Sequence, residues 1–183
     1  MRHTILVLPG LNNSGEGHWQ TRWESLLPRA RRVPQHDWDT PQRADWVVAL
    51  DAEIAAVDGT VTLVAHSLGC ALTAWWAAAH RTAAHAAKVT GALLVAPPDV
   101  ERADFPLEQH GFAPMPRAVL PFKSIVVASS DDPWCALGRA RSWARDWGAD
   151  FRDIGARGHI NSASGLGDWE QGREWLVQLE KAA

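Results

Sequence analysis

The sequence predicts an α/β fold of three layers, in which helices cover both faces of a mainly parallel sheet of about six strands. Three observations support this expectation. Short apolar segments alternate with segments of ten or more residues that have helical periodicity. The apolar segments are continuous, as is typical of strands that are buried on both faces. The 183 residues contain no repeat and no linker-like stretch, so we expect one domain over residues 1–183.

The first half of the chain predicts three strands and three helices. The strands are expected at 3–8, near 31–35 and at 61–65. The first helix carries Trp19, Trp23, Leu26 and Leu27 on one face, and the others are expected over 42–57 and 70–80. Pro9-Gly10 ends the first strand, and the polar loop 11–17 leads into the first helix.

The second half predicts strands at 89–95, 123–128 and 149–154, with helices over 136–147 and 168–181. The segment 96–121 does not fit this rhythm, because it contains several prolines together with Phe105, Phe112 and Met115. Loops of this length in a compact domain usually have a function. We expect a small cap over a binding site, with a long surface loop as the alternative.

The composition excludes several classes of protein. The net charge is −3, and 21% of the residues are charged, so no basic excess predicts binding to nucleic acid or to a membrane surface. The apolar run at the N-terminus is too short for a signal peptide or a membrane span, which favours a cytoplasmic location. We expect a monomer or a homodimer. Two cysteines, Cys70 and Cys135, predict neither a disulfide nor a metal site, and no motif predicts a cofactor.

The most informative segment joins the strand at 61–65 to the helix that follows it. His66-Ser67-Leu68-Gly69 lies at this junction and is close to the Gly-x-Ser-x-Gly nucleophile elbow, with Ala65 in place of the first glycine. Such a turn exposes the serine hydroxyl at the carboxyl end of the sheet, beside the N-terminus of a helix. We therefore expect Ser67 to be a nucleophile, although an incidental serine in a buried turn is the alternative.

A serine nucleophile needs a base and a carboxylate that orients the base. Both follow Ser67 in the expected order, each after a later strand: Asp132 after 123–128 and His159 after 149–154. Asp131, Asp99 and Asp104 compete for the role of the acid. The other seven histidines lie outside a loop that follows a late strand, so His159 is the preferred base.

The oxyanion of the tetrahedral intermediate needs two backbone N–H donors. We expect these to be Leu68, at the start of the helix, and Leu11, in the loop after the first strand, with Asn12 as the next choice for the second donor. The residues expected to line the substrate pocket are Asn12, His66, Phe105, Phe112, Met115 and Trp134.

These motifs together resemble the small serine hydrolases of the YdeN type, relatives of retinoblastoma-binding protein nine. The resemblance runs nearly end to end and includes Pro9-Gly10, His18-Trp19, His66 to Cys70, Val95 to Asp99, Ser130 to Pro133, Gly158 to Asn161 and Ser164 to Trp169. It implies a minimal α/β-hydrolase fold with the triad Ser67, Asp132 and His159. Ala65 departs from the glycine that is usual in the family.

The sequence therefore predicts a cofactor-free serine hydrolase that cleaves a small acyl substrate through an acyl-enzyme. Carboxylesterase activity is expected first, with short acyl groups preferred, and peptidase activity is also compatible with the pattern. Two alternatives stay open: a catalytically silent binding protein on the same scaffold, and acyl transfer or lyase chemistry on the same triad.

Overall fold

A computed structural model describes residues 2–106 and 110–181 of the chain. Six parallel strands form one sheet in the order β2-β1-β3-β4-β5-β6. Their bounds are β1 His3–Leu8, β2 Ala30–Arg32, β3 Thr60–His66, β4 Val89–Val95, β5 Lys123–Ala128 and β6 Asp150–Asp153. The predicted parallel sheet of about six strands is confirmed.

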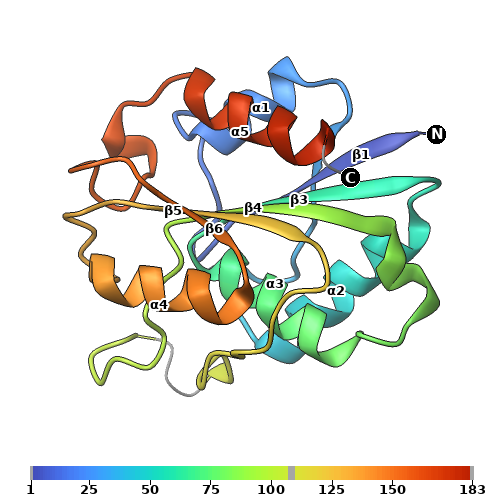
Figure 1. Ribbon diagram of the computed structural model, residues 1–183, viewed down its shortest axis with the longest axis horizontal. Helices are drawn as coiled ribbons and strands as arrows, with labels where there is room; N and C mark the ends of the chain where they lie inside the picture. The colour runs from blue at the N-terminus through green and yellow to red at the C-terminus, as the bar shows by residue number, and fades with distance from the viewer. Residues whose placement is uncertain (1, 107–109, 182–183) are drawn as a thin grey trace.

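Helices cover both faces of the sheet (Figure 1). On one face lie α1 (Trp19–Leu26) and α5 (Glu170–Lys181), and on the other α2 (Arg43–Ala56), α3 (Leu68–Ala79) and α4 (Leu137–Trp147). Two 3₁₀ turns, η1 (Ala84–Lys88) and η3 (Ser162–Ser164), had no counterpart in the sequence prediction. Within the described ranges, no helix has the length and the apolar character needed to cross a membrane.

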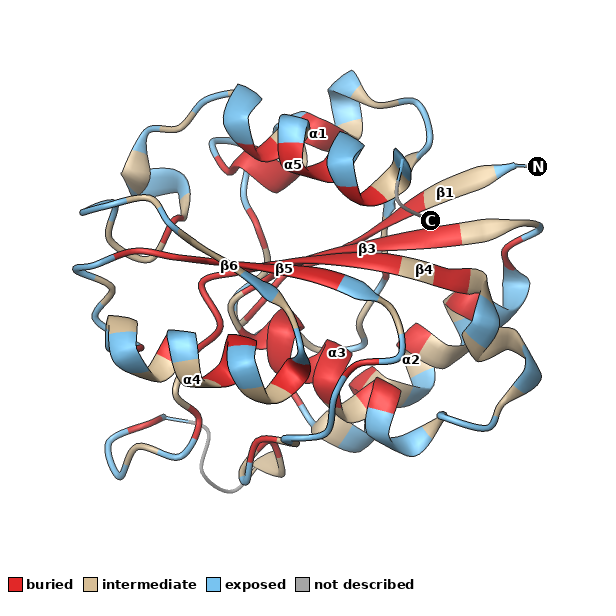
Figure 2. Ribbon diagram, viewed as in Figure 1, coloured by how far each residue is buried: buried red, intermediate tan, exposed pale blue. Residues whose placement is uncertain are grey.

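The strands are buried on both sides, which explains their continuous apolar sequences (Figure 2). In β1 the side chains alternate between the two faces: Ile5 and Val7 pack with α1 and α5, whereas Leu6 and Leu8 pack toward the other helical layer. The tryptophans at helical spacing lie in these two cores. Trp19 and Trp23 are in the core beneath α1 and α5, and Trp143 and Trp147 are in the core on the other face of the sheet.

The strand β2 is shorter and begins one residue earlier than predicted. It pairs with β1 only over Ala30–Arg32, and one further hydrogen bond runs from Val33 N to Val7 O. Pro34 follows directly, and because proline has no N–H it cannot extend the ladder. The strand therefore ends where its sequence loses the donor.

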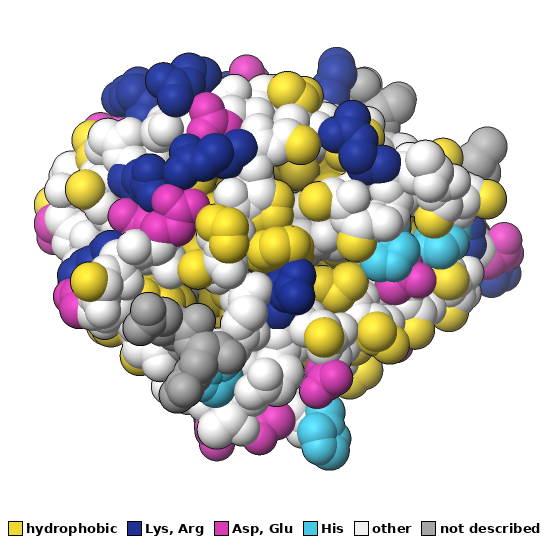
Figure 3. Space-filling view, turned by 90° about the horizontal axis from the view of Figure 1, so that it is seen from below, with side chains coloured by type: hydrophobic (Ala, Val, Ile, Leu, Met, Phe, Trp, Pro, Cys, Tyr) yellow, Lys and Arg dark blue, Asp and Glu magenta, His cyan; other side chains and the backbone are white. Residues whose placement is uncertain are grey.

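The crossover segment, residues 97–121, connects β4 to β5, and its role as a small cap stays a prediction. Its described residues run along the helical layer below α3 and α4 (Figure 1). Trp75 Nε1 in α3 donates to Phe112 O at 2.8 Å, and Trp147 Nε1 in α4 donates to Pro116 O at 2.8 Å. Ion pairs from Glu101 to Arg139 and from Arg117 to Asp146, the partners in α4, add to this attachment. On the face that this segment helps to form, basic side chains lie beside acidic ones (Figure 3).

Candidate active site

Ser67 occupies a strained turn between β3 and α3. Its backbone has φ 53° and ψ −123°, a conformation that non-glycine residues rarely adopt and that is typical of a nucleophile elbow. The turn is held because Ser67 N donates to Val95 O at 2.9 Å. Gly69 is required by close packing, since a Cβ there would lie 2.2 Å from Leu8 O. Ala65, which stands in place of the first glycine, is fully buried in the core.

The loops after β5 and β6 bring a carboxylate and an imidazole to this serine. Ser67 Oγ lies 2.7 Å from His159 Nε2. His159 Nδ1 lies 2.9 Å from each carboxylate oxygen of Asp132. A carboxylate only accepts hydrogen bonds, so Nδ1 carries the proton and Nε2 is free to accept from the serine hydroxyl. The Asp132 side chain is only 3% exposed, and that of His159 is 11% exposed.

The three competing acids have other partners. Asp131 Oδ1 accepts from Ser129 Oγ at 2.7 Å and from Gly158 N at 2.7 Å, and these bonds hold the pKa of Asp131 below its usual value. Asp99 forms an ion pair with Arg139 at 3.3 Å. Asp104 is exposed and pairs with Arg102. Of the four candidate acids, the geometry therefore brings Asp132 to the imidazole.

Two backbone N–H groups are free beside the serine. Leu68 N opens α3, and Leu11 N follows Gly10; neither N–H has a hydrogen-bond partner among the described residues. Gly10 approaches the elbow so closely that a Cβ there would lie 2.8 Å from Ser67 Cβ and 3.0 Å from Leu68 N. The choice of Asn12 as the next donor is wrong, because Asn12 N already donates to Trp38 O at 2.8 Å.

Two further histidines, His66 and His18, lie next to His159. His66 Nε2 donates to the backbone oxygen of His159 at 2.8 Å, and the ring of His18 packs edge-on against the ring of His66 at 4.6 Å. Burial is the main cause that lowers the pKa of His18 to about 4, and it also holds the pKa of His66 well below its usual value. Both rings are therefore neutral at physiological pH.

Ser67 and His159 line a cavity of about 430 Å³. Of the six predicted lining residues, Asn12, His66, Phe105 and Trp134 line it. The prediction is wrong for Phe112 and Met115, whose side chains are 0% and 2% exposed and belong to the core beneath the sheet. The apolar side chains of the segment 97–121 pack against the helical layer there, and Phe112 contacts Trp46 edge-on at 5.8 Å.

Sequence reasoning missed several residues of the cavity. These are Asn13, Gly15, His18, Pro98, Pro106, Asn161, Ser162 and Ala163. All lie in loops or in the short 3₁₀ turn η3, which have no periodicity to indicate where a side chain points. The sequence offered one signal for His18, which directly precedes the predicted first helix. In the structure His18 caps α1, and its Nδ1 accepts from Gln20 N.

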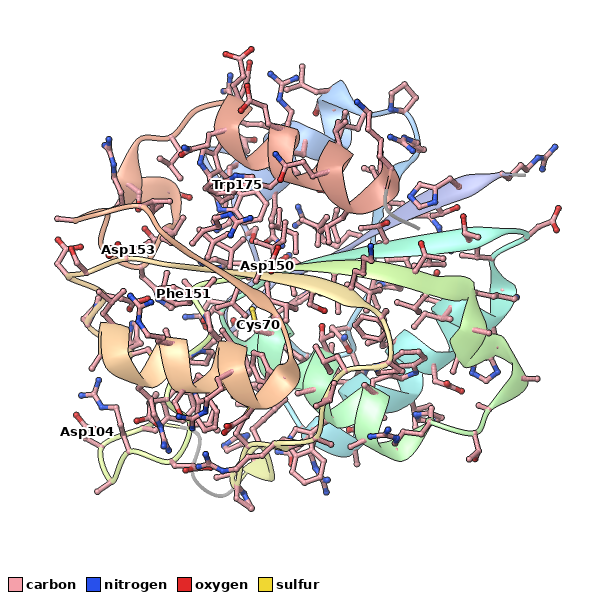
Figure 4. All side chains as sticks on the ribbon, viewed as in Figure 1. Cys70, Asp104, Asp150, Phe151, Asp153 and Trp175 are labelled. Atoms are coloured by element: carbon pink, nitrogen blue, oxygen red, sulfur yellow. The ribbon has the colours of Figure 1, made fainter. Side chains whose placement is uncertain are left out.

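Buried cysteines and surface carboxylates lie outside this chemistry. Cys70 belongs to α3 and is buried on the side of that helix that faces the sheet, whereas Asp104 lies at the outer edge of the crossover segment (Figure 4). Burial raises the pKa of the Cys70 thiol well above its usual value, and it raises that of Cys135 to about 12. Neither thiol is therefore activated as a nucleophile.

Comparison with known proteins agrees with this architecture. A family described as serine hydrolase matches residues 5–178. A solved structure described as a YdeN-like hydrolase from Pectobacterium atrosepticum is 29% identical, with a TM-score of 0.86 over 98% of this chain and 91% of that chain. None of the curated proteins that were compared with the chain matches it.

More distant structures share the fold. The ydeN gene product from B. subtilis is 19% identical, with a TM-score of 0.77 over 98% of this chain and 100% of that chain. Est1E from Butyrivibrio proteoclasticus, solved with ferulic acid bound, is 10% identical, with a TM-score of 0.67 over 98% and 90% of the two chains. The predicted α/β-hydrolase fold is confirmed.

Proposed function

The chain belongs to the serine hydrolase family, and on that premise we propose that it hydrolyses esters of small acyl groups through an acyl-enzyme formed on Ser67. The observation that carries the proposal is the continuous chain of hydrogen bonds from Ser67 Oγ through the His159 ring to Asp132. A serine hydroxyl in this setting can lose its proton to the imidazole as it attacks.

The reaction proceeds in two halves. Ser67 Oγ bonds to the acyl carbon while His159 Nε2 takes the hydroxyl proton, and the C–O bond to the alcohol breaks as His159 returns that proton to the alcohol oxygen. A water molecule then attacks the acyl-enzyme by the same route. It gives a proton to His159, which passes it to Ser67 Oγ as the acid is released.

The remaining groups stabilise charge during both halves. Asp132 keeps the proton of His159 on Nδ1 and stabilises the imidazolium that forms. The N–H groups of Leu68 and Leu11 are the proposed donors to the oxyanion, and each such donor contributes about 3–4 kcal/mol in enzymes where one has been removed. The size of the cavity supports a preference for short acyl groups over long chains.

Hydrolysis of a short-chain ester tests this proposal. We expect Ser67→Ala to lower kcat on the order of 10⁴-fold, as removal of a triad member does in other serine hydrolases. Ser25→Ala is the matched control, because Ser25 is an exposed serine on α1 outside the cavity. Equal activity of the Ser67→Ala protein and the wild type would overturn the proposal.

A further inference from the structure

The cavity has two chemically different walls. The polar wall consists of residues from the loop after β1 and the loop after β6: Asn12, Asn13, His18, Asn161 and Ser162. The two loops touch, since Trp19 Nε1 donates to Ile160 O at 2.9 Å and a Cβ on Gly17 would lie 3.8 Å from Ser162 Cβ. The polar wall is therefore one continuous surface.

The apolar wall comes from the other side of the elbow. It consists of Pro98, Phe105 and Pro106, from the start of the crossover segment, and Trp134, from the turn after β5. The two segments are joined because Asp99 N donates to Trp134 O at 2.9 Å, and the rings of Phe105 and Trp134 meet edge-on at 6.3 Å. Trp134 is 38% exposed, so much of its surface remains for a ligand.

The polar wall has hydrogen-bonding capacity that the described protein atoms leave unused. The side-chain amide of Asn12 lines the cavity and has no partner among the described residues, although its backbone N–H donates to Trp38 O. Asn161 uses only its oxygen, which accepts from Ala163 N, so its NH₂ group is free. The oxygen of Asn13 likewise accepts from Ser14 N and Arg32, which leaves its NH₂ group. The unused groups are mostly donors, and they suit a ligand that carries acceptors.

No described residue that lines the cavity is Lys, Arg, Asp or Glu. The histidines His18 and His66 are neutral, because burial lowers their pKa values. Two charged groups lie just outside the lining: Asp132 lies behind the His159 ring, and Arg32, which is paired with Glu24, donates to Asn13 Oδ1. A charged ligand would lose hydration on binding without gaining an ion pair, which costs binding free energy.

The proton transfer sets which part of the ester meets which wall. His159 gives its proton to the alcohol oxygen, so the alcohol part leaves from the side of the imidazole. Asn161 and Ser162 lie two and three residues after His159 in the chain and belong to the polar wall. The acyl part then extends toward Phe105 and Trp134.

We propose that the site selects uncharged esters in which a short apolar acyl group is joined to an alcohol that carries hydrogen-bond acceptors, such as an amide carbonyl. This inference rests on the proposed serine hydrolase activity. The apolar wall takes the acyl group, and the NH₂ groups of the polar wall donate to the alcohol part.

Four esters test the proposal. Three share the butanoyl group and differ in the alcohol: N-acetylethanolamine is neutral, glycolate is anionic and choline is cationic. The fourth, the butyl ester of N-acetylglycine, is an isomer of the first in which the polar and apolar parts exchange places. Release of acid, measured by titration, gives kcat/KM for each.

We expect the N-acetylethanolamine ester to exceed each of the other three in kcat/KM by at least tenfold. If a charged ester equals or exceeds it, the selection for neutral substrates is wrong. A faster fourth ester would overturn the assignment of acyl and alcohol parts to the two walls. The proposed function fails separately, when no ester is hydrolysed in a manner that depends on Ser67.

A charge variant links the preference to the polar wall. Asn12→Asp retains the side-chain shape. Aspartate, like asparagine, tolerates the left-handed backbone at this position, where φ is 61°. We expect it to raise kcat/KM for the choline ester relative to the neutral ester by at least tenfold. Ser25→Asp, which adds the same charge outside the cavity, is the control. An unchanged ratio in Asn12→Asp would overturn the placement of the alcohol part on this wall.

Discussion

Asp131 and Asp132 are neighbours in the chain, but their carboxylates have different partners. Asp132 accepts from the imidazole of His159, whereas Asp131 accepts from Gly158 N and so supports the loop that carries His159. The spacing of the triad could be predicted from the order of strands and loops. The choice between two adjacent acids depends on side-chain directions in a turn, which no sequence pattern specifies.

Substitution of these acids separates the two roles. We expect Asp132→Asn to remain folded and to lose most of kcat with little change in KM, because the amide favours the wrong tautomer of His159. Asp131→Asn and Asp99→Asn should keep kcat within about tenfold of the wild type, roughly 1.4 kcal/mol. Steady-state kinetics of the three variants checks this. A dead Asp99→Asn beside a healthy Asp132→Asn would refute the assignment.

His18 makes the stability of the protein depend on pH. Its pKa is about 4 in the folded state, against 6.5 as the ordinary value. Above pH 6.5 the ring is neutral in both states. As the pH falls from 6.5 toward 4, the unfolded chain gains the proton first, so the free energy of unfolding decreases.

We expect His18→Asn to reduce this loss, since asparagine can still cap α1 but does not titrate. Between about pH 7 and pH 4.5, the wild type should lose about 2–3 kcal/mol more unfolding free energy than the variant. Urea denaturation at both pH values measures the difference. Parallel losses in the two proteins would show that His18 does not carry the effect.

At the scale of the element, the junction of β3 and α3 depends on the absence of a side chain at Gly69. A methyl group there would collide with the carbonyl oxygen of Leu8, at the end of β1. This contact brings the loop after β1 and the elbow together, so the same glycine serves both stability and the site. A small residue at this position could be predicted from the motif, and its contact with β1 required the structure.

A pair of identical substitutions tests this. Gly69→Ala should lower the free energy of unfolding by about 1–3 kcal/mol, as overpacking of a close contact does. Gly138→Ala in α4 has open space around the new methyl group and should raise stability by up to about 1 kcal/mol through helix propensity. Urea denaturation compares both with the wild type. Equal effects of the two substitutions would mean that the close approach is not a constraint.

The crossover segment shows where prediction from the sequence ended. Prolines with interspersed Phe105, Phe112 and Met115 are compatible with a cap over the site and equally with a segment that packs against the helical layer. Composition indicates that such residues need burial but not which surface buries them. Phe105 and Phe112 both belong to the core, but only Phe105 also lines the cavity, and only the tertiary contacts distinguish them.

At the scale of the whole molecule, the fold brings together the loops that follow four strands, at the carboxyl ends of these strands. The loop after β1 supplies Leu11, the elbow after β3 supplies Ser67, and the loops after β5 and β6 supply Asp132 and His159. The strand order places β3 between β1 and β4. Continuous apolar strands predicted this sheet, and the alternation with helices predicted its parallel direction. The polar wall of the cavity could not be predicted, because its asparagines lie in irregular loops.

Covalent labelling tests the central claim most directly. The wild-type protein is treated with a fluorophosphonate, digested, and searched by mass spectrometry for the modified peptide. We predict a single adduct, on Ser67, that is absent from Ser67→Ala and strongly reduced in His159→Ala, because attack on phosphorus needs the base. Labelling that persists in Ser67→Ala, or a folded wild type that takes no label, would contradict the account.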